Sequence, residues 1–163
     1  MPLERAPEAE GRPCGTSPDS PIQLVSHTLL SRNQVFSIHF DHIRDNHGNG
    51  VSNYLSVIPL HTVGSLTGVC ILPVIGEKIG LIQVYRHPLA RWSLEAPKGF
   101  IDKNEAPAAA ALRELIEETG LAVSENHLCY LGSVAPEAGV IEGMVGMFYA
   151  DLRNEKVENV LSK

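Results

Sequence analysis

Three glutamates near the middle of the sequence have the residue type and spacing of a metal-binding helix face. On an α-helix, which turns by about 100° per residue, Glu114, Glu117 and Glu118 fall within an arc of roughly 100°. Their like charges repel one another, and a divalent cation removes that penalty. Mg²⁺ binds a few carboxylates together with water and phosphate oxygens. The pattern therefore predicts a metal site that faces a phosphate-bearing ligand, with a solvated acidic helix face as the alternative.

The helix that must carry these glutamates is predicted over residues 105–119. Pro107 suits its first turn, residues 108–112 are strong helix formers, and Gly120 is a natural stop. Ala110 lies on the glutamate side and is expected to leave room for a ligand. Other apolar residues are expected to face the core: Ala108, Leu112, Leu115 and Ile116.

Strands are predicted on both sides of this helix. Partial alternation predicts a hairpin over 34–60, and the almost continuously apolar segments 68–75 and 80–86 predict a second hairpin that is buried on both faces. Two more strands are expected near 127–134 and 143–151. Strands, a central helix and further strands indicate an α+β fold with a mixed sheet.

Composition narrows the class of protein. The chain has 163 residues and a formal net charge of −6, which argues against nucleic acid as the main partner. No apolar run approaches the roughly 20 residues that cross a bilayer, and the first residues lack the apolar stretch of a signal peptide. Residues 1–20 are predicted to be a flexible arm before one domain over 21–163. A cytoplasmic protein without a membrane segment is expected.

The segment 99–121 resembles the Nudix box. That motif runs Gly, five residues, Glu, seven residues, Arg-Glu, an aliphatic residue, any residue, Glu-Glu, any residue, Gly, aliphatic. All nine fixed positions are filled without a gap, by Gly99, Glu105, Arg113, Glu114, Leu115, Glu117, Glu118, Gly120 and Leu121. The resemblance implies a Nudix fold, an α/β/α sandwich with a mixed sheet, and Mg²⁺ or Mn²⁺ as cofactor.

The resemblance also implies roles for single positions. Glu105 would bind a further ion or orient the loop, and Arg113 would hold a glutamate in place. The positions that correspond to metal ligands are Gly99, Glu114, Glu117 and Glu118. Glu117 and Glu118, together with Glu142, form the candidate catalytic set.

The general base is the least determined of these roles. Related proteins usually continue with an acidic loop, a strand and a closing helix, and that loop often supplies the base. The present sequence ends at Lys163, so the expected Nudix fold would lack the C-terminal strand and helix. A truncated product and a short natural variant are both consistent with a sequence that ends at this position. The acids outside the box that remain available are Glu137, Glu142, Glu155 and Glu158.

The flanks of the box are similar to those of ADP-ribose pyrophosphatases. The sequence QVYRHPLARWSLEAPKG ahead of the box makes Arg86 and Glu95 candidate substrate-binding residues, and Pro136 stands at a spacing associated with that group. A guanidinium suits phosphate because it presents several fixed donors. Lys98 departs from the pattern, because a small residue is usual there. Trp92 could stack on a base or pack against other residues.

The implied activity is hydrolysis of the pyrophosphate bond of a nucleoside diphosphate derivative, with ADP-ribose giving AMP and ribose 5-phosphate. Alternatives are a dinucleoside polyphosphate, which Lys98-Gly99 favours slightly, NADH, coenzyme A or a nucleotide sugar. A non-catalytic, nucleotide-sensing Nudix domain is an alternative of another class. Pairing of two chains through the N-terminal strands is also implied, with Phe36, Phe40 and Tyr54 at the interface or in the core.

Overall fold

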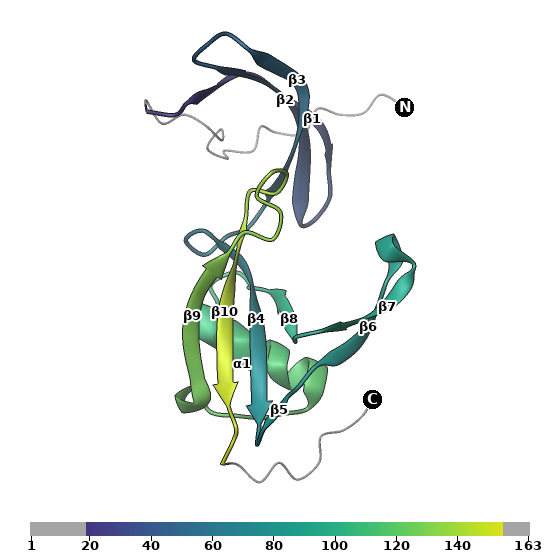
Figure 1. Ribbon diagram of the computed structural model, residues 1–163, viewed down its shortest axis with the longest axis vertical. Coiled ribbons are helices and arrows are strands. Elements are labelled where there is room, and N and C mark those ends of the chain that lie inside the picture. Colours follow the sequence, from purple (N-terminus) through teal and green to yellow (C-terminus); the bar gives the residue numbers. More distant parts are fainter. Residues whose placement is uncertain (1–18, 155–163) are drawn as a thin grey trace. The chain divides into compact units, whose positions relative to one another are not determined.

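The computed structural model describes residues 19–154, and its chain divides between Ile58 and Pro59 into two units (Figure 1). The first unit is a three-stranded sheet in the order β1-β2-β3, formed by β1 (Ile22–Arg32), β2 (Phe36–Asp45) and β3 (Gly50–Pro59). β2 and β3 confirm the hairpin expected over 34–60. The expected arm over 1–20 lies almost entirely outside the described residues.

One face of β2 is buried and polar, which reverses the usual pattern of a sheet. Ser37, His39 and Asp41 are each less than a tenth exposed, whereas Phe40 between them is 37% exposed. Asp41 receives a hydrogen bond from Ser56 at 2.6 Å and pairs with Nδ1 of His27 at 2.6 Å. His27 in turn stacks on His39, with ring centroids 3.9 Å apart. Strands β1, β2 and β3 are therefore joined by side chains as well as by backbone.

This cluster predicts a loss of stability in mild acid. Burial, reinforced by the neighbouring His27, lowers the pKa of His39, and within residues 19–154 no group hydrogen-bonds to its Nδ1. In the unfolded chain, His39 therefore binds a proton near pH 6.5. In the folded chain, His39 binds a proton only at a lower pH. The free energy of unfolding should fall as the pH drops below that value, by at most about 1.4 kcal/mol per pH unit for one proton.

Urea unfolding of the wild type and of His39→Leu at pH 7.5 and 5.5 measures this effect. The variant should lose part of the pH dependence. His47→Ala changes an exposed histidine in the turn before β3 and should keep it. Equal pH dependence in the wild type and in His39→Leu would contradict the assignment.

The second unit is built around β4 (Leu66–Ile75). β10 (Met144–Asp151) runs parallel to β4, and β9 (Leu128–Val134) pairs antiparallel with β10. On the other side of β4, the short strands β8 (Lys98–Phe100) and β5 (Lys78–Ile79) pair antiparallel with it at different heights. The sheet is therefore mixed, as the sequence predicts, and the strands near 127–134 and 143–151 are confirmed.

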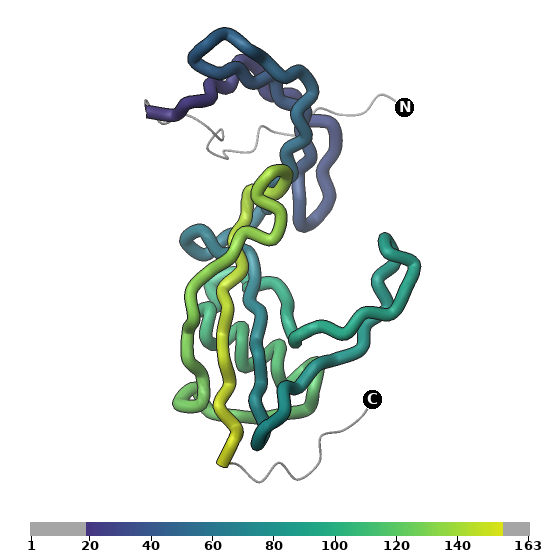
Figure 2. Tube along the Cα trace, in the orientation of Figure 1, coloured from purple at the N-terminus to yellow at the C-terminus, as the bar shows by residue number. Residues whose placement is uncertain are grey.

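The second hairpin expected from the sequence is wrong in most of its length. β4 pairs with only two residues of β5, while β6 (Ile82–Arg86) pairs with β7 (Arg91–Glu95) in a separate two-stranded ribbon (Figure 2). A 3-10 turn at His87–Leu89 returns the chain, with Pro88 in its first positions. β6 alternates between half-buried and exposed residues, so it is not buried on both faces.

α1 (Pro107–Thr119) covers one face of the mixed sheet and packs against β4 and β8 (Figure 1). It begins at Pro107, two residues after the predicted start at 105, and Gly120 ends it with a φ of 75°, as expected. The core contains Val69, Ile71 and Phe148 from the strands and Ala110, Ala111 and Leu115 from the helix. Within residues 19–154, α1 is the only α-helix, and no helix there is long and apolar enough to cross a membrane.

Two details of the predicted helix faces are wrong. Ile116 was expected in the core but is 45% exposed, and Ala110 was expected to leave room for a ligand but is fully buried. The core-facing side of α1 is centred near Ala111 and Leu115, which lie one turn apart. Ile116 is rotated by about 100° from Leu115 and so reaches solvent.

Candidate functional site

The glutamates of α1 lie at the boundary between the buried and the exposed side of the helix. The side chain of Glu114 is only 12% exposed, Glu118 is half-buried, and Glu117 is 56% exposed. The exposure of Glu117 follows from its angular position, because Glu118 and Glu114 stand closer than Glu117 to the face centred near Ala111 and Leu115. The site is therefore at the edge of the helix–sheet interface and not on the open helix face.

Gly99 provides the floor beneath Glu114. β8 places Gly99 opposite Val69 of β4, and α1 crosses above it. A Cβ at Gly99 would overlap the carboxylate of Glu114. The glycine of the box is thus required by space, because any side chain there would displace a candidate ligand. Its φ is not positive, so a tight left-handed turn is not the reason.

Gly99→Ala should therefore lower activity more than stability. The colliding atoms are the far end of a flexible side chain, so Glu114 can swing away while the fold persists. We expect activity to fall about a hundredfold, since displacement of a catalytic group by about 1 Å has effects of that size. The free energy of unfolding should change by less than about 1.5 kcal/mol.

Gly68→Ala is the contrasting variant. A Cβ at Gly68 would lie 2.5 Å from the backbone carbonyl oxygen of Gly99, which cannot rotate away. This variant should lose about 1–3 kcal/mol of stability through backbone displacement. Thermal unfolding and turnover measured on both variants separate the two effects, and equal destabilisation would contradict the explanation.

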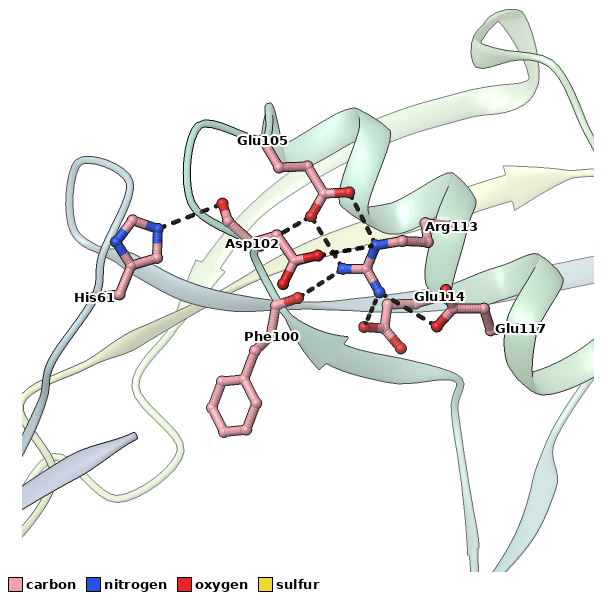
Figure 3. Close-up of polar contacts among 7 residues, drawn as sticks. All are labelled: His61, Phe100, Asp102, Glu105, Arg113, Glu114 and Glu117. Atoms are coloured by element: carbon pink, nitrogen blue, oxygen red, sulfur yellow. Dashed lines mark hydrogen bonds and ion pairs between the residues drawn. The ribbon is translucent and has the colours of Figure 1, made fainter. Parts of the chain in front are cut away.

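Arg113 organises the acidic side chains around it (Figure 3). Its guanidinium donates to both oxygens of Glu105, at 2.9 and 3.0 Å, and to the carbonyl oxygen of Phe100 at 2.9 Å. Nη1 donates to Glu114 at 2.7 Å and to Glu117 at 3.3 Å. Glu105 also receives a hydrogen bond from the backbone N–H of Asp102. One arginine therefore ties the loop of the box to the first two helix glutamates.

These contacts set the charge states of the group. Arg113 lowers the pKa of Glu105 and is itself kept protonated, because its pKa is raised chiefly by Glu105. Arg113 is the residue that the resemblance expects to hold a glutamate, and the structure shows it holding three. Glu105 is used to orient the loop, which is one of the two roles expected for it.

Glu118 has a different partner. Its Oε2 accepts a hydrogen bond of 2.8 Å from the backbone N–H of Lys98. Burial raises the pKa of Glu118, and the charge of Glu114 adds to this, while the Lys98 amide opposes it. The ionised form of Glu118 is therefore less stable in the protein than in water, and a cation beside it would offset that cost.

The donor chemistry fits a divalent cation. Carboxylate oxygens and the backbone carbonyl oxygen of Gly99 in β8 are hard oxygen ligands of the kind that Mg²⁺ prefers. Gly99 leaves the space beneath Glu114 free of side chain, and burial raises the pKa of Glu118 although the charges of Arg86 and Lys98 lower it. Within residues 19–154, however, no three His, Cys, Asp or Glu side chains are arranged to hold a metal ion as they stand. Glu114 and Glu117 are turned onto Arg113, so the metal site stays a prediction.

Arg86 and Glu95 form a second charged group close to Glu118. Arg86 donates to both oxygens of Glu95, with Nη2–Oε2 at 2.6 Å and Nε–Oε1 at 2.9 Å. The ammonium of Lys98 lies 2.5 Å from the same Oε2. Arg86, followed by Lys98, holds the pKa of Glu95 well below its usual range. The sequence singled out Arg86 and Glu95, but it gave no sign that Lys98 binds the same carboxylate.

Other candidates lie elsewhere. Glu142 and Pro136 are exposed in the connection between β9 and β10, and the contacts described for the helix glutamates run to Arg113 and to Lys98. The roles of Glu142 and Pro136 therefore stay predictions. Trp92 is 63% exposed and contacts Tyr85 across the β6–β7 ribbon, so packing in the core is excluded. Because Tyr85 and Arg86 are consecutive in a strand, Trp92 shares the ribbon face opposite to Arg86.

A carboxylate-lined site at the edge of a helix packed on a mixed sheet defines the class of α+β domain to which this chain belongs. The sequence model of the NUDIX domain matches residues 64–153, more than half of the chain, and the chain belongs to this family. The match lies within the second unit and includes β4, the β6–β7 ribbon, α1 and β10.

Individual relatives are similar over shorter stretches. The ADP-sugar pyrophosphatase of Mus musculus is 44% identical over 61 residues, covering 34% of this chain and 28% of that protein. The ADP-ribose pyrophosphatase of Bacillus subtilis is 36% identical over 84 residues, covering 51% and 44%. The chain thus spans less than half the length of these curated relatives. A crystal structure of an ADP compounds hydrolase superposes with a TM-score of 0.65 at 20% identity, over 85% of this chain and 75% of that one, which shows the shared fold.

Proposed function

We propose that this protein is a Mg²⁺-dependent Nudix hydrolase that cleaves the pyrophosphate bond of a nucleoside diphosphate derivative, with ADP-ribose as the first candidate. The observation that carries this proposal is the Arg113-centred group of glutamates above Gly99, next to the exposed cations Arg86 and Lys98. Carboxylates for a metal and cations for a phosphate chain are then adjacent. The names of the pyrophosphatase relatives support the same substrate class.

In this mechanism the chain positions the substrate and handles a proton. Gly99, Glu114, Glu117 and Glu118 would hold the metal, which when bound neutralises the diphosphate and acidifies a water molecule. Arg86 orients the phosphates through its fixed donors. Water then adds to one phosphorus, the bridging oxygen leaves with the other phosphate, and a carboxylate accepts the proton of the water. ADP-ribose and water give AMP and ribose 5-phosphate.

The candidates for the proton acceptor are Glu117, Glu118 and Glu142. A base is most effective when its pKa lies near the working pH. The pKa of Glu118 is raised in the protein alone, but a metal bound by Glu118 would lower it, so the pKa does not choose among the three. Glu142 also stays a candidate for the proton acceptor, because it is an acid of the connection between β9 and β10.

Chromatography of the products on a panel of substrates tests the proposal. The panel contains ADP-ribose, ADP-glucose, NADH, coenzyme A and diadenosine polyphosphates, each with Mg²⁺ and with EDTA. We expect AMP and ribose 5-phosphate from ADP-ribose with Mg²⁺, and none with EDTA. Tight nucleotide binding without turnover of any substrate would contradict the enzyme and favour a nucleotide-sensing domain.

We also propose that two chains pair through the N-terminal sheet. Several apolar side chains of this sheet are largely exposed: Val25, Leu29, Leu30, Phe40, Val51 and Leu55. Light scattering after gel filtration should give the mass of a dimer, and Phe40→Ser should shift it toward the monomer. A wild-type monomer at micromolar concentration would contradict this part of the proposal.

A further inference from the structure

Two arginines stand directly opposite each other near the tip of the β6–β7 ribbon. Arg86 is the last residue of β6, Arg91 is the first residue of β7, and the strand register pairs them. Directly opposite residues project their side chains from the same face of a two-stranded ribbon, with Cα atoms about 4.5–5.5 Å apart. The ribbon therefore presents two guanidinium groups on one face.

The turn at the tip fixes this arrangement. Pro88 restricts the backbone of the 3-10 turn, and Ala90 ends that turn with a left-handed φ of 49°. This conformation is unfavourable for a residue other than glycine, because its Cβ crowds the backbone. The chain thus adopts an unfavourable conformation immediately before Arg91, at the point that places Arg91 opposite Arg86.

Only one of the two arginines has a carboxylate partner. Arg86 extends to Glu95, to which its Nη2 donates at 2.6 Å, and the ammonium of Lys98 contacts the same carboxylate. Arg91 is exposed, and within residues 19–154 its guanidinium makes no hydrogen bond or ion pair. Three cations and one carboxylate leave this group with a net charge of +2, although the chain as a whole carries −6.

This pair of arginines suits a bound anion better than it suits the fold. Like charges directly opposite each other on two strands are destabilising, so Arg91 weakens the ribbon that carries it. A phosphate group removes that repulsion, because its oxygens accept parallel hydrogen bonds from a guanidinium. The pair is also connected to the candidate metal ligands. Lys98, which contacts Glu95 with its side chain, donates its backbone N–H to Glu118 at 2.8 Å.

We propose that Arg91 is a second substrate-binding arginine, which together with Arg86 holds the diphosphate of a nucleoside diphosphate derivative such as ADP-ribose. Arg86 holds the phosphate nearer the candidate metal ligands, and Arg91 holds the other phosphate. A diphosphate then binds more tightly than a single phosphate, so the substrate is retained and the two monophosphate products are released. The inference rests on the proposed function for its substrate and adds a residue to that site.

Calorimetric titration with imidodiphosphate in excess Mg²⁺ measures this binding, because the P–N–P linkage resists hydrolysis and the compound carries no nucleoside. Arg91→Gln should weaken the binding by about tenfold to a hundredfold, as expected for one lost hydrogen bond between charged groups. Binding of inorganic phosphate should hardly change, since Arg86 and the metal suffice for one phosphate.

Two further variants serve as controls. Arg91→Lys keeps the charge without the planar fork and should retain part of the affinity for imidodiphosphate. Lys78→Gln removes a cation from β5, which pairs with the end of β4 remote from β8, and should bind imidodiphosphate like the wild type. Thermal unfolding separates binding from folding, because Arg91→Gln relieves a repulsion and should not lower the melting temperature.

Kinetics with ADP-ribose complete the test. Arg91→Gln should raise KM about tenfold or more and change kcat by less than about threefold, because Arg91 holds substrate and transition state alike. Unchanged affinity for imidodiphosphate, or an equal loss of affinity for imidodiphosphate and for phosphate, would overturn the inference. Binding of imidodiphosphate that depends on Arg91, without hydrolysis of any substrate of the panel, would refute the proposed function and leave the phosphate-binding role of Arg91 standing.

Discussion

Glu118→Gln should lower turnover by roughly a thousandfold or more while the protein stays folded. The neutral amide removes a ligand charge, and charge stabilisation by a catalytic metal is worth several kcal/mol, at about 1.4 kcal/mol per factor of ten in rate. The fold should tolerate the change, because burial already disfavours the ionised form of Glu118. The glutamine oxygen can still accept the hydrogen bond from the backbone of Lys98.

The measurement is kcat for ADP-ribose with saturating Mg²⁺, together with the Mg²⁺ concentration that gives half-maximal activity. Glu77→Gln is the matched control, because Glu77 lies exposed in the turn between β4 and β5. That variant should keep the wild-type rate. Unchanged hydrolysis by Glu118→Gln would remove Glu118 from the catalytic set and, with it, the proposed metal site.

Arg113→Lys should weaken both the fold and the activity. A lysine keeps the charge but cannot replace the fork that reaches Glu105, Phe100 and Glu114 together. Because Arg113 is 27% exposed, the loss of its charged hydrogen bonds should cost about 1–3 kcal/mol. Activity should fall at least tenfold, since Glu114 and Glu117 lose the donor that orients them.

Arg153→Lys is the matched control for this variant. Arg153 also binds a carboxylate with two donors, on Asp151, but its side chain is 58% exposed. Exposed pairs of this kind contribute little to stability because solvent screens them, so the stability should hardly change. Chemical unfolding and turnover of both variants give the comparison. Equal stability of Arg113→Lys and the wild type would show that the network around Arg113 is not structural.

Local chemistry made the helix predictable. The place of Pro107 in the first turn and the end at Gly120 follow from backbone geometry within one element, and the structure agrees with both, although the helix begins two residues later than predicted. The mixed sheet also followed from the order of strands around the helix. The sequence did not predict the burial of every apolar residue of α1. The burial of Ile116 and Ala110 depends on how the helix is rotated against β4.

Strand pairing required the tertiary structure. Periodicity identifies a strand but not its partner, so the segment 80–86 was predicted to pair with β4, whereas its residues in β6 pair with β7. The polar face of β2 was likewise not anticipated. Ser37, His39 and Asp41 become acceptable inside the sheet only through partners from β1 and β3, which are remote in sequence.

The sequence by itself determined the family, the helix and the residues predicted to bind a metal, because a spaced motif on one helix needs no distant contact to be recognised. Only the tertiary structure decided how those residues are used in the folded chain. It turned Glu114 and Glu117 onto Arg113, Glu118 onto the backbone of Lys98, and Arg86 and Lys98 onto one carboxylate. The physical reason is that the interactions of a charged side chain depend on its burial and on the charges around it. Both are set by elements that meet only when the sheet, the ribbon and the helix have packed together.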